Sequence, residues 1–188
     1  MEKLNGWENA NSFGDFKTLK AGAYKCEVKG VEELSSSNGK KFIKISLDIV
    51  EGEFKNYFSD KYENDTRTDK KWSGIWNLFL EGYEAGSINT KFKGFITSIE
   101  KSNAGFTWDW NEQHLTNKVV GIVFREEEFK ANDGSIKSSA KPYYAVAVNE
   151  LDNVKIPDPK LLEGELGSLS NSSSNSDYDT FQGDDLPF

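Results

Sequence analysis

Apolar and polar residues alternate from Ala23 onward, with Cys26 and Val28 on the apolar side. Strict alternation of this kind is typical of a half-buried β-strand. The run 35–39, Ser-Ser-Ser-Asn-Gly, contains the Asn-Gly pair that favours a tight hairpin turn, and alternation resumes over 41–49. The pattern therefore predicts two antiparallel strands joined by a short turn.

A third strand is predicted over 54–59, after a bend at Glu51-Gly52-Glu53. Phe54 and Phe58 would lie on one side of this strand and Tyr57 on the other, because successive strand side chains point to opposite faces.

The period then changes to three and four residues, which predicts a helix over 72–83 and another over 92–99. Alternation returns over 119–129 and again at 144–148, and Asn132-Asp133-Gly134 between them predicts a second hairpin turn.

Three strands, a helical insertion and a closing hairpin follow one another in the order of the OB fold. We therefore expect a mainly β protein, an OB-fold-like five-stranded antiparallel barrel with a helical insertion between strands 3 and 4. Another small β-barrel or an α+β sandwich fits the same order. The domain would span 1–152, and 153–188 would form a flexible acidic tail.

The charge distribution supports this division. The chain of 188 residues has a net charge of −8, and residues 153–188 contribute two lysines and seven carboxylates. Residues 167–180 contain six serines and scarcely any apolar group, so they cannot bury enough surface to fold. Any affinity of the domain for nucleic acid must come from local clusters of cations.

Composition argues against catalysis. The single cysteine excludes an internal disulfide framework, and the single histidine excludes a site built from several imidazoles. Cys26 is interpreted as a core residue and His114 as a surface residue. No Gly-rich phosphate loop, metal-ligand spacing or nucleophile motif is present. We expect no enzyme activity, no cofactor and no metal. The absence of a membrane-spanning run or signal peptide predicts a cytoplasmic protein.

Cations and aromatic rings alternate over 55–72, a combination that single-stranded nucleic acid requires because cations follow the phosphates and rings stack on bases. Tyr57 is the leading stacking candidate, although an ordinary outward tyrosine fits equally well. Trp108 and Trp110 could form a stacking platform or close the barrel end. The candidate contacts are Lys44, Lys55, Tyr57, Lys61, Tyr62, Arg67, Lys70, Lys71, Trp72 and Arg125.

The C-terminal residues Asp184, Asp185, Leu186, Pro187 and Phe188 resemble the acidic tip of bacterial single-stranded DNA-binding proteins, with fewer aspartates than the usual form. In that family the tip follows a disordered linker and docks on partner proteins. The resemblance implies that Phe188 would enter an apolar pocket of a partner while basic residues meet the carboxylates.

The body carries a second resemblance over roughly 17–150. Its motifs are Glu51 to Phe58, Asp65-Thr66-Arg67, Lys71-Trp72, Phe92 to Asn103, Trp108-Asp109-Trp110 and Gly121 to Phe124. Together they resemble a family of small phage proteins from Gram-positive hosts that look like replication single-strand binders. The resemblance implies a sequence-nonspecific single-stranded DNA-binding protein of phage replication, recombination or repair, acting in the host cytoplasm, with replication or recombination proteins as partners and possible homo-oligomers. A non-catalytic β-barrel that binds carbohydrate or protein is the alternative.

Overall fold

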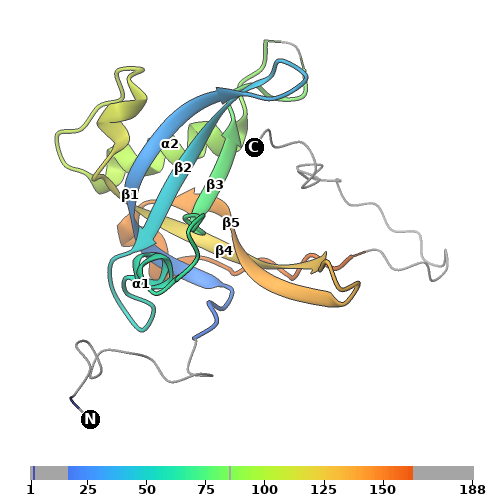
Figure 1. Cartoon of the computed structure of the whole chain (residues 1–188). Coiled ribbons are helices and arrows are strands. Elements are labelled where there is room, and N and C mark those ends of the chain that lie inside the picture. The colour runs from blue at the N-terminus through green and yellow to red at the C-terminus, as the bar shows by residue number, and fades with distance from the viewer. Residues whose placement is uncertain (1, 3–16, 85, 163–188) are drawn as a thin grey trace.

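A five-stranded antiparallel sheet organises the protein in the computed structural model, which describes residues 2, 17–84 and 86–162 (Figure 1). The strand order is β3-β2-β1-β4-β5. The mainly β prediction is confirmed, but the sheet is open, since no pairing joins β3 to β5. The strands are β1 (Gly22–Ser35), β2 (Lys41–Ile49), β3 (Ile75–Phe79), β4 (Val119–Lys130) and β5 (Ile136–Val146).

Helices fill the connections between the strands. α1 (Tyr57–Glu63) links β2 to β3, and α2 (Thr90–Ser102) links β3 to β4. Two short 3-10 helices complete the described elements, η2 (Glu112–Leu115) before β4 and η3 (Val148–Asn153) after β5. Among the described residues, no helix is both long enough and apolar enough to cross a membrane.

The predicted helix over 92–99 is confirmed by α2. Asn89 caps its start, because the side-chain oxygen accepts hydrogen bonds from the backbone N–H groups of Lys91 and Phe92. The helix packs against β3, β4 and β5 and buries Phe92, Phe95, Ile96 and Ile99. It thus covers the core where the open sheet would leave it exposed.

The core between sheet and helix contains the apolar side of the first predicted strand. Cys26 and Val28 on β1 are fully buried, as are Ile45 and Leu47 on β2. The interpretation of Cys26 as a core residue is confirmed. Burial, with a smaller contribution from the charge of Asp48, raises the pKa of the Cys26 thiol and leaves it unreactive.

Both predicted hairpin turns are confirmed. Gly39 and Gly134 have φ angles of 79° and 81°, in the left-handed region that glycine adopts without a steric cost. Figure 1 shows the β1–β2 hairpin and the β4–β5 hairpin extending from the centre of the molecule in different directions.

The predicted third strand over 54–59 is wrong, because a turn leads there into α1. Asn56 adopts a left-handed backbone with φ of 61°, which ends the extended chain before the helix begins. Phe54 and Phe58 are four residues apart, so in this turn and helix they reach the same side and are both buried. Two apolar residues at this spacing fit a strand and a helical turn equally well.

The predicted helix over 72–83 is also wrong, because its centre is β3. Trp76 and Leu78 face the core, while Ile75, Asn77 and Phe79 are half-buried on the other side. Apolar residues on both faces hide the two-residue period of this strand. The third strand of the predicted order therefore exists, but it lies later in the chain.

Gly74 occupies a position where the chain runs beside β2 too closely for a side chain, and its carbonyl accepts a hydrogen bond from the N–H of Leu47 at 2.8 Å. A Cβ atom there would lie 2.4 Å from the carbonyl oxygen of Leu47 and 2.6 Å from the ring of Phe58. Gly74→Ala is expected to destabilise the protein by about 2–3 kcal/mol in urea unfolding. Gly94, in α2, has open space around its Cβ position, so Gly94→Ala is expected to stabilise by about 0.5–1 kcal/mol. Equal stability of the two variants would contradict this packing.

The chain beyond η3 runs along the outer half of β4. The N–H of Glu128 donates to the carbonyl of Lys160, and the N–H of Lys160 donates to the carbonyl of Glu126, both at 2.9 Å. Residues 163–188, most of the predicted tail, lie outside the described residues. The boundary between 152 and 153 remains a prediction.

Candidate functional site

The side chain of Asp48 fixes the start of α1. This carboxylate is 2% exposed, and it accepts hydrogen bonds from the backbone N–H of Phe58 at 3.0 Å and from the hydroxyl of Ser59. The first N–H groups of a helix have no partner within the helix, so an acceptor from β2 ties α1 to the sheet. The rings and cations of α1 are thereby held at a defined place.

Five of the predicted contact residues lie around α1, and we call them the α1 cluster: Tyr57, Lys61, Tyr62, Lys70 and Trp72. The Lys70 ammonium lies 4.6 Å from the ring centre of Tyr62, and that ring lies 5.7 Å from the indole of Trp72. The Lys61 ammonium lies 5.9 Å from the ring of Tyr57. Cations placed beside aromatic faces are the pairing that nucleotide binding requires.

Tyr57 does not face outward from a strand as predicted. It is the first residue of α1 and is half-buried, with its ring 6.0 Å from Phe54 and 5.1 Å from Phe58. Its hydroxyl oxygen accepts a hydrogen bond from the N–H of Leu19 at 3.4 Å. Much of the Tyr57 ring is thus engaged in packing. Tyr62 is half-buried as well, with Lys70 and Trp72 beside its ring.

Trp72 is likewise half-buried. Its indole N–H donates to the carbonyl of Leu47 at 3.0 Å, and its ring packs against the core. Trp76, on β3, is 6% exposed and belongs to the core.

Arg67 is exposed and bound to a carboxylate. Its guanidinium donates to both oxygens of Asp65, at 2.6 Å from the terminal nitrogen and 3.0 Å from Nε. These hydrogen bonds hold the pKa of Asp65 at about 2, well below its usual value. The pair is locally neutral, so Arg67 contributes less net charge to a DNA site than its sequence position suggests.

The remaining lysines differ in their surroundings. Lys55 and Lys71 are exposed, and neither forms an ion pair within the part of the chain that the structure describes. Lys44 lies on β2 and is 3.9 Å from Glu32 on the neighbouring β1. Lys71 adjoins the α1 cluster in sequence, whereas Lys44 belongs to the sheet.

Arg125 belongs to a second group that the sequence did not reveal. It lies on β4, and its guanidinium carbon is 4.0 Å from the ring centre of Tyr143 on β5. The ammonium of Lys91, from the first turn of α2, is 4.3 Å from the same ring. Arg125 also pairs with Glu127 at 2.6 Å. Neither Lys91 nor Tyr143 lies in a recognisable motif, and only the fold brings them to Arg125.

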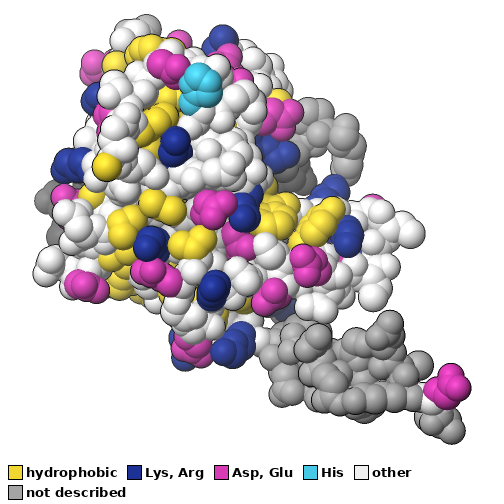
Figure 2. Space-filling model, turned by 90° about the vertical axis from the view of Figure 1, so that its left-hand side faces the viewer, with side chains coloured by type: hydrophobic (Ala, Val, Ile, Leu, Met, Phe, Trp, Pro, Cys, Tyr) yellow, Lys and Arg dark blue, Asp and Glu magenta, His cyan; other side chains and the backbone are white. Residues whose placement is uncertain are grey.

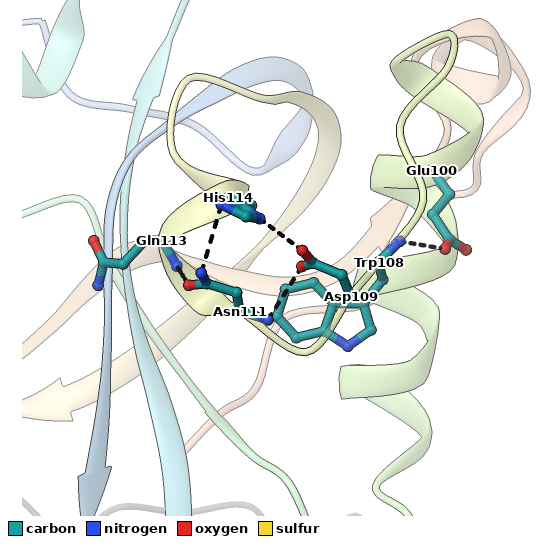
Figure 3. A network of polar contacts seen from close by, with 6 residues as sticks. All are labelled: Glu100, Trp108, Asp109, Asn111, Gln113 and His114. Carbon is teal, nitrogen blue, oxygen red and sulfur yellow. Dashed lines mark hydrogen bonds and ion pairs between the residues drawn. The ribbon is translucent and has the colours of Figure 1, made fainter.

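The loop between α2 and β4 holds Trp108 and Trp110. Figure 3 shows Trp108 and the polar contacts around it. The backbone N–H of Trp108 donates to the carboxylate of Glu100 at 2.9 Å, and the half-buried Trp108 ring packs against the core. Trp110 is 76% exposed, with its ring centre 6.1 Å from that of Trp108. His114 is an exposed residue, as expected, and contacts Asp109 at 2.8 Å. Trp108 thus closes the core while Trp110 faces solvent.

The charges on the face shown in Figure 2 are mixed. Lysine and arginine side chains alternate there with aspartate and glutamate, and hydrophobic side chains lie between them. That face therefore presents no continuous basic surface. The predicted tip residues, Asp184 to Phe188, lie outside the described residues.

Residues 6–75 match the model of a protein family described as "Protein of unknown function (DUF669)". The matched stretch includes β1, β2 and α1, and with them the Asp48 contact and the whole α1 cluster. A search of curated proteins returned no match.

Proposed function

We propose that the protein binds single-stranded DNA without sequence preference, as a phage replication and recombination protein, on an OB fold. The strand connectivity carries this proposal. β1, β2 and β3 pair in order, α2 follows β3, and β4 returns beside β1 with β5 at its outer side. This order supports an OB fold, which is a five-stranded, partly open barrel whose surface binds oligonucleotides.

The aromatic and cationic pairs support the same function. Tyr62 with Lys70 and Tyr143 with Arg125 each place a cation within 5 Å of a ring centre. Base stacking on a ring is indifferent to sequence, because every base has a π-face, and a nearby cation attracts the phosphates. The protein would act by coating unpaired strand, with no chemical step.

Recruitment of partner proteins is the second part of the proposal. It rests on the resemblance of Asp184 to Phe188 to the tip of bacterial single-stranded DNA-binding proteins. The tip would offer its phenylalanine and carboxylates to replication or recombination enzymes while the domain holds DNA.

The proposal predicts salt-dependent binding of single strands. Oligo-dT is expected to quench tryptophan fluorescence, and the logarithm of the affinity should fall with the logarithm of salt by about 0.7 for each phosphate contacted. Duplex of the same length serves as control and should bind more weakly. A preference for duplex, or affinity that salt does not change, would contradict DNA binding; salt-insensitive binding of sugars or proteins would favour the alternative module.

A further inference from the structure

Arg125 has far more hydrogen-bonding capacity than the protein uses. Its side chain is only 16% exposed, and its one hydrogen bond within the described residues is the 2.6 Å contact with Glu127. A guanidinium carries five N–H donors, so four remain without a protein acceptor there. Its Nε atom is buried and without a partner. Buried donors of this kind are costly unless an acceptor reaches them.

A second cation lies beside the same ring. The centre of the Tyr143 ring is 4.0 Å from the guanidinium carbon of Arg125 and 4.3 Å from the ammonium of Lys91. Lys141 lies directly opposite Arg125 in the β4–β5 ladder. Glu127 is the carboxylate that pairs with Arg125. Cations brought together in this way attract an anion locally, although the chain as a whole has a net charge of −8.

The group lies at the opening of the sheet. Cα atoms of β3 and β5 approach within 8 Å, yet no strand pairing joins them. Two further buried polar atoms on these strands have no partner within the described residues, Asn77 Oδ1 on β3 and Ser139 Oγ on β5. Ser139 is directly opposite Glu127 in the β4–β5 ladder. Glu127 and Arg125 are two residues apart on β4, so the three side chains lie on the same face of the sheet. Both edge strands of the open sheet thus carry a buried polar atom without a partner among the described residues.

We propose that Arg125, Lys91 and Tyr143 form a binding site for one phosphodiester group of the bound strand, at the seam between β3 and β5. The proposal rests on the proposed function and locates a second contact apart from the α1 cluster. The phosphate oxygens would accept from the guanidinium and from the Lys91 ammonium, while Tyr143 holds both cations in place. Glu127 keeps the guanidinium oriented.

The test is a charge-neutral double variant of the full chain, Arg125→Gln with Glu127→Gln. It removes the guanidinium without leaving a half-buried carboxylate unpaired and without changing the net charge. Lys29 and Glu27 on β1 form a matched i,i+2 ion pair at 3.0 Å, so Lys29→Gln with Glu27→Gln is the control. Affinity for oligo-dT is measured across a salt series, and thermal unfolding by circular dichroism monitors folding.

The seam variant is expected to bind about tenfold more weakly than the control, with the log–log salt slope shallower by about 0.7, the loss of one phosphate contact. Lys91→Gln should give a similar loss of slope, and it decides the matter if the double variant does not fold. If the wild-type protein binds oligo-dT and both variants retain its affinity and slope, the seam site is wrong while the proposed function stands. Failure of the wild-type protein to bind any single strand overturns both.

Discussion

Asp48→Ala is expected to destabilise the protein by about 3 kcal/mol. The carboxylate is 2% exposed and accepts from the Phe58 N–H and the Ser59 hydroxyl. Alanine supplies no acceptor, and each buried donor left without a partner costs about 1–3 kcal/mol. Urea unfolding followed by tryptophan fluorescence measures the change.

Two further variants separate this contact from a general effect of charge. Asp48→Asn keeps one carbonyl oxygen for the Phe58 N–H, so its loss should be smaller than that of alanine. Asp60 is an exposed acid in the first turn of the same helix, and Asp60→Ala should cost no more than about 1 kcal/mol. If Asp48→Ala and Asp60→Ala unfold at the same urea concentration, the Asp48 contact does not hold α1.

The Asp48 contact also links the stability of the fold to the proposed DNA-binding surface. β2 ends next to Asp48, and the helix that it caps carries Tyr57, Lys61 and Tyr62. Loss of the cap would free the start of α1 and displace its rings and cations from the neighbouring Trp72. Weak DNA binding by Asp48→Ala would therefore reflect a displaced surface, since the carboxylate itself is buried.

The sequence correctly predicted those elements in which the local preference of the residues agrees with their packing in the fold. The two hairpins have turn residues that only a few turn types accept, and α2 has a clear cap and a single apolar face. The wrong predictions at 54–59 and 72–83 share one cause. Aromatic residues there are dense enough to satisfy both the helical and the strand period, so packing against β2 decides the outcome.

The α1 cluster could be predicted as a group because its members are close in the chain. Its orientation could not be predicted, because it depended on whether Tyr57 lay on a strand or on a helix. The group of Arg125, Lys91 and Tyr143 could not be predicted, because it forms only through contacts between α2, β4 and β5. In the sequence, Arg125 is only one cation of the predicted closing hairpin, and no spacing connects it to Lys91.

Neutralising the lysines of the α1 region should weaken DNA binding on the order of a hundredfold at low salt. Lys61 and Lys70 lie beside the rings of Tyr57 and Tyr62, and Lys71 is exposed next to them. Replacing all three by glutamine removes up to three phosphate contacts, so the log–log salt slope should become shallower by about 2. A salt titration with oligo-dT measures both quantities.

A control variant with the same net charge separates the effect of where these lysines lie from the effect of the total charge of the chain. Lys29, Lys93 and Lys101 are exposed on β1 and α2, and their replacement by glutamine removes the same three charges. Long-range attraction depends on total charge and is screened beyond about 10 Å at 0.1 M salt. The control should therefore approach wild-type affinity as salt rises, whereas the α1 variant stays weaker. Identical salt slopes for the two triple variants would place the DNA elsewhere than along α1.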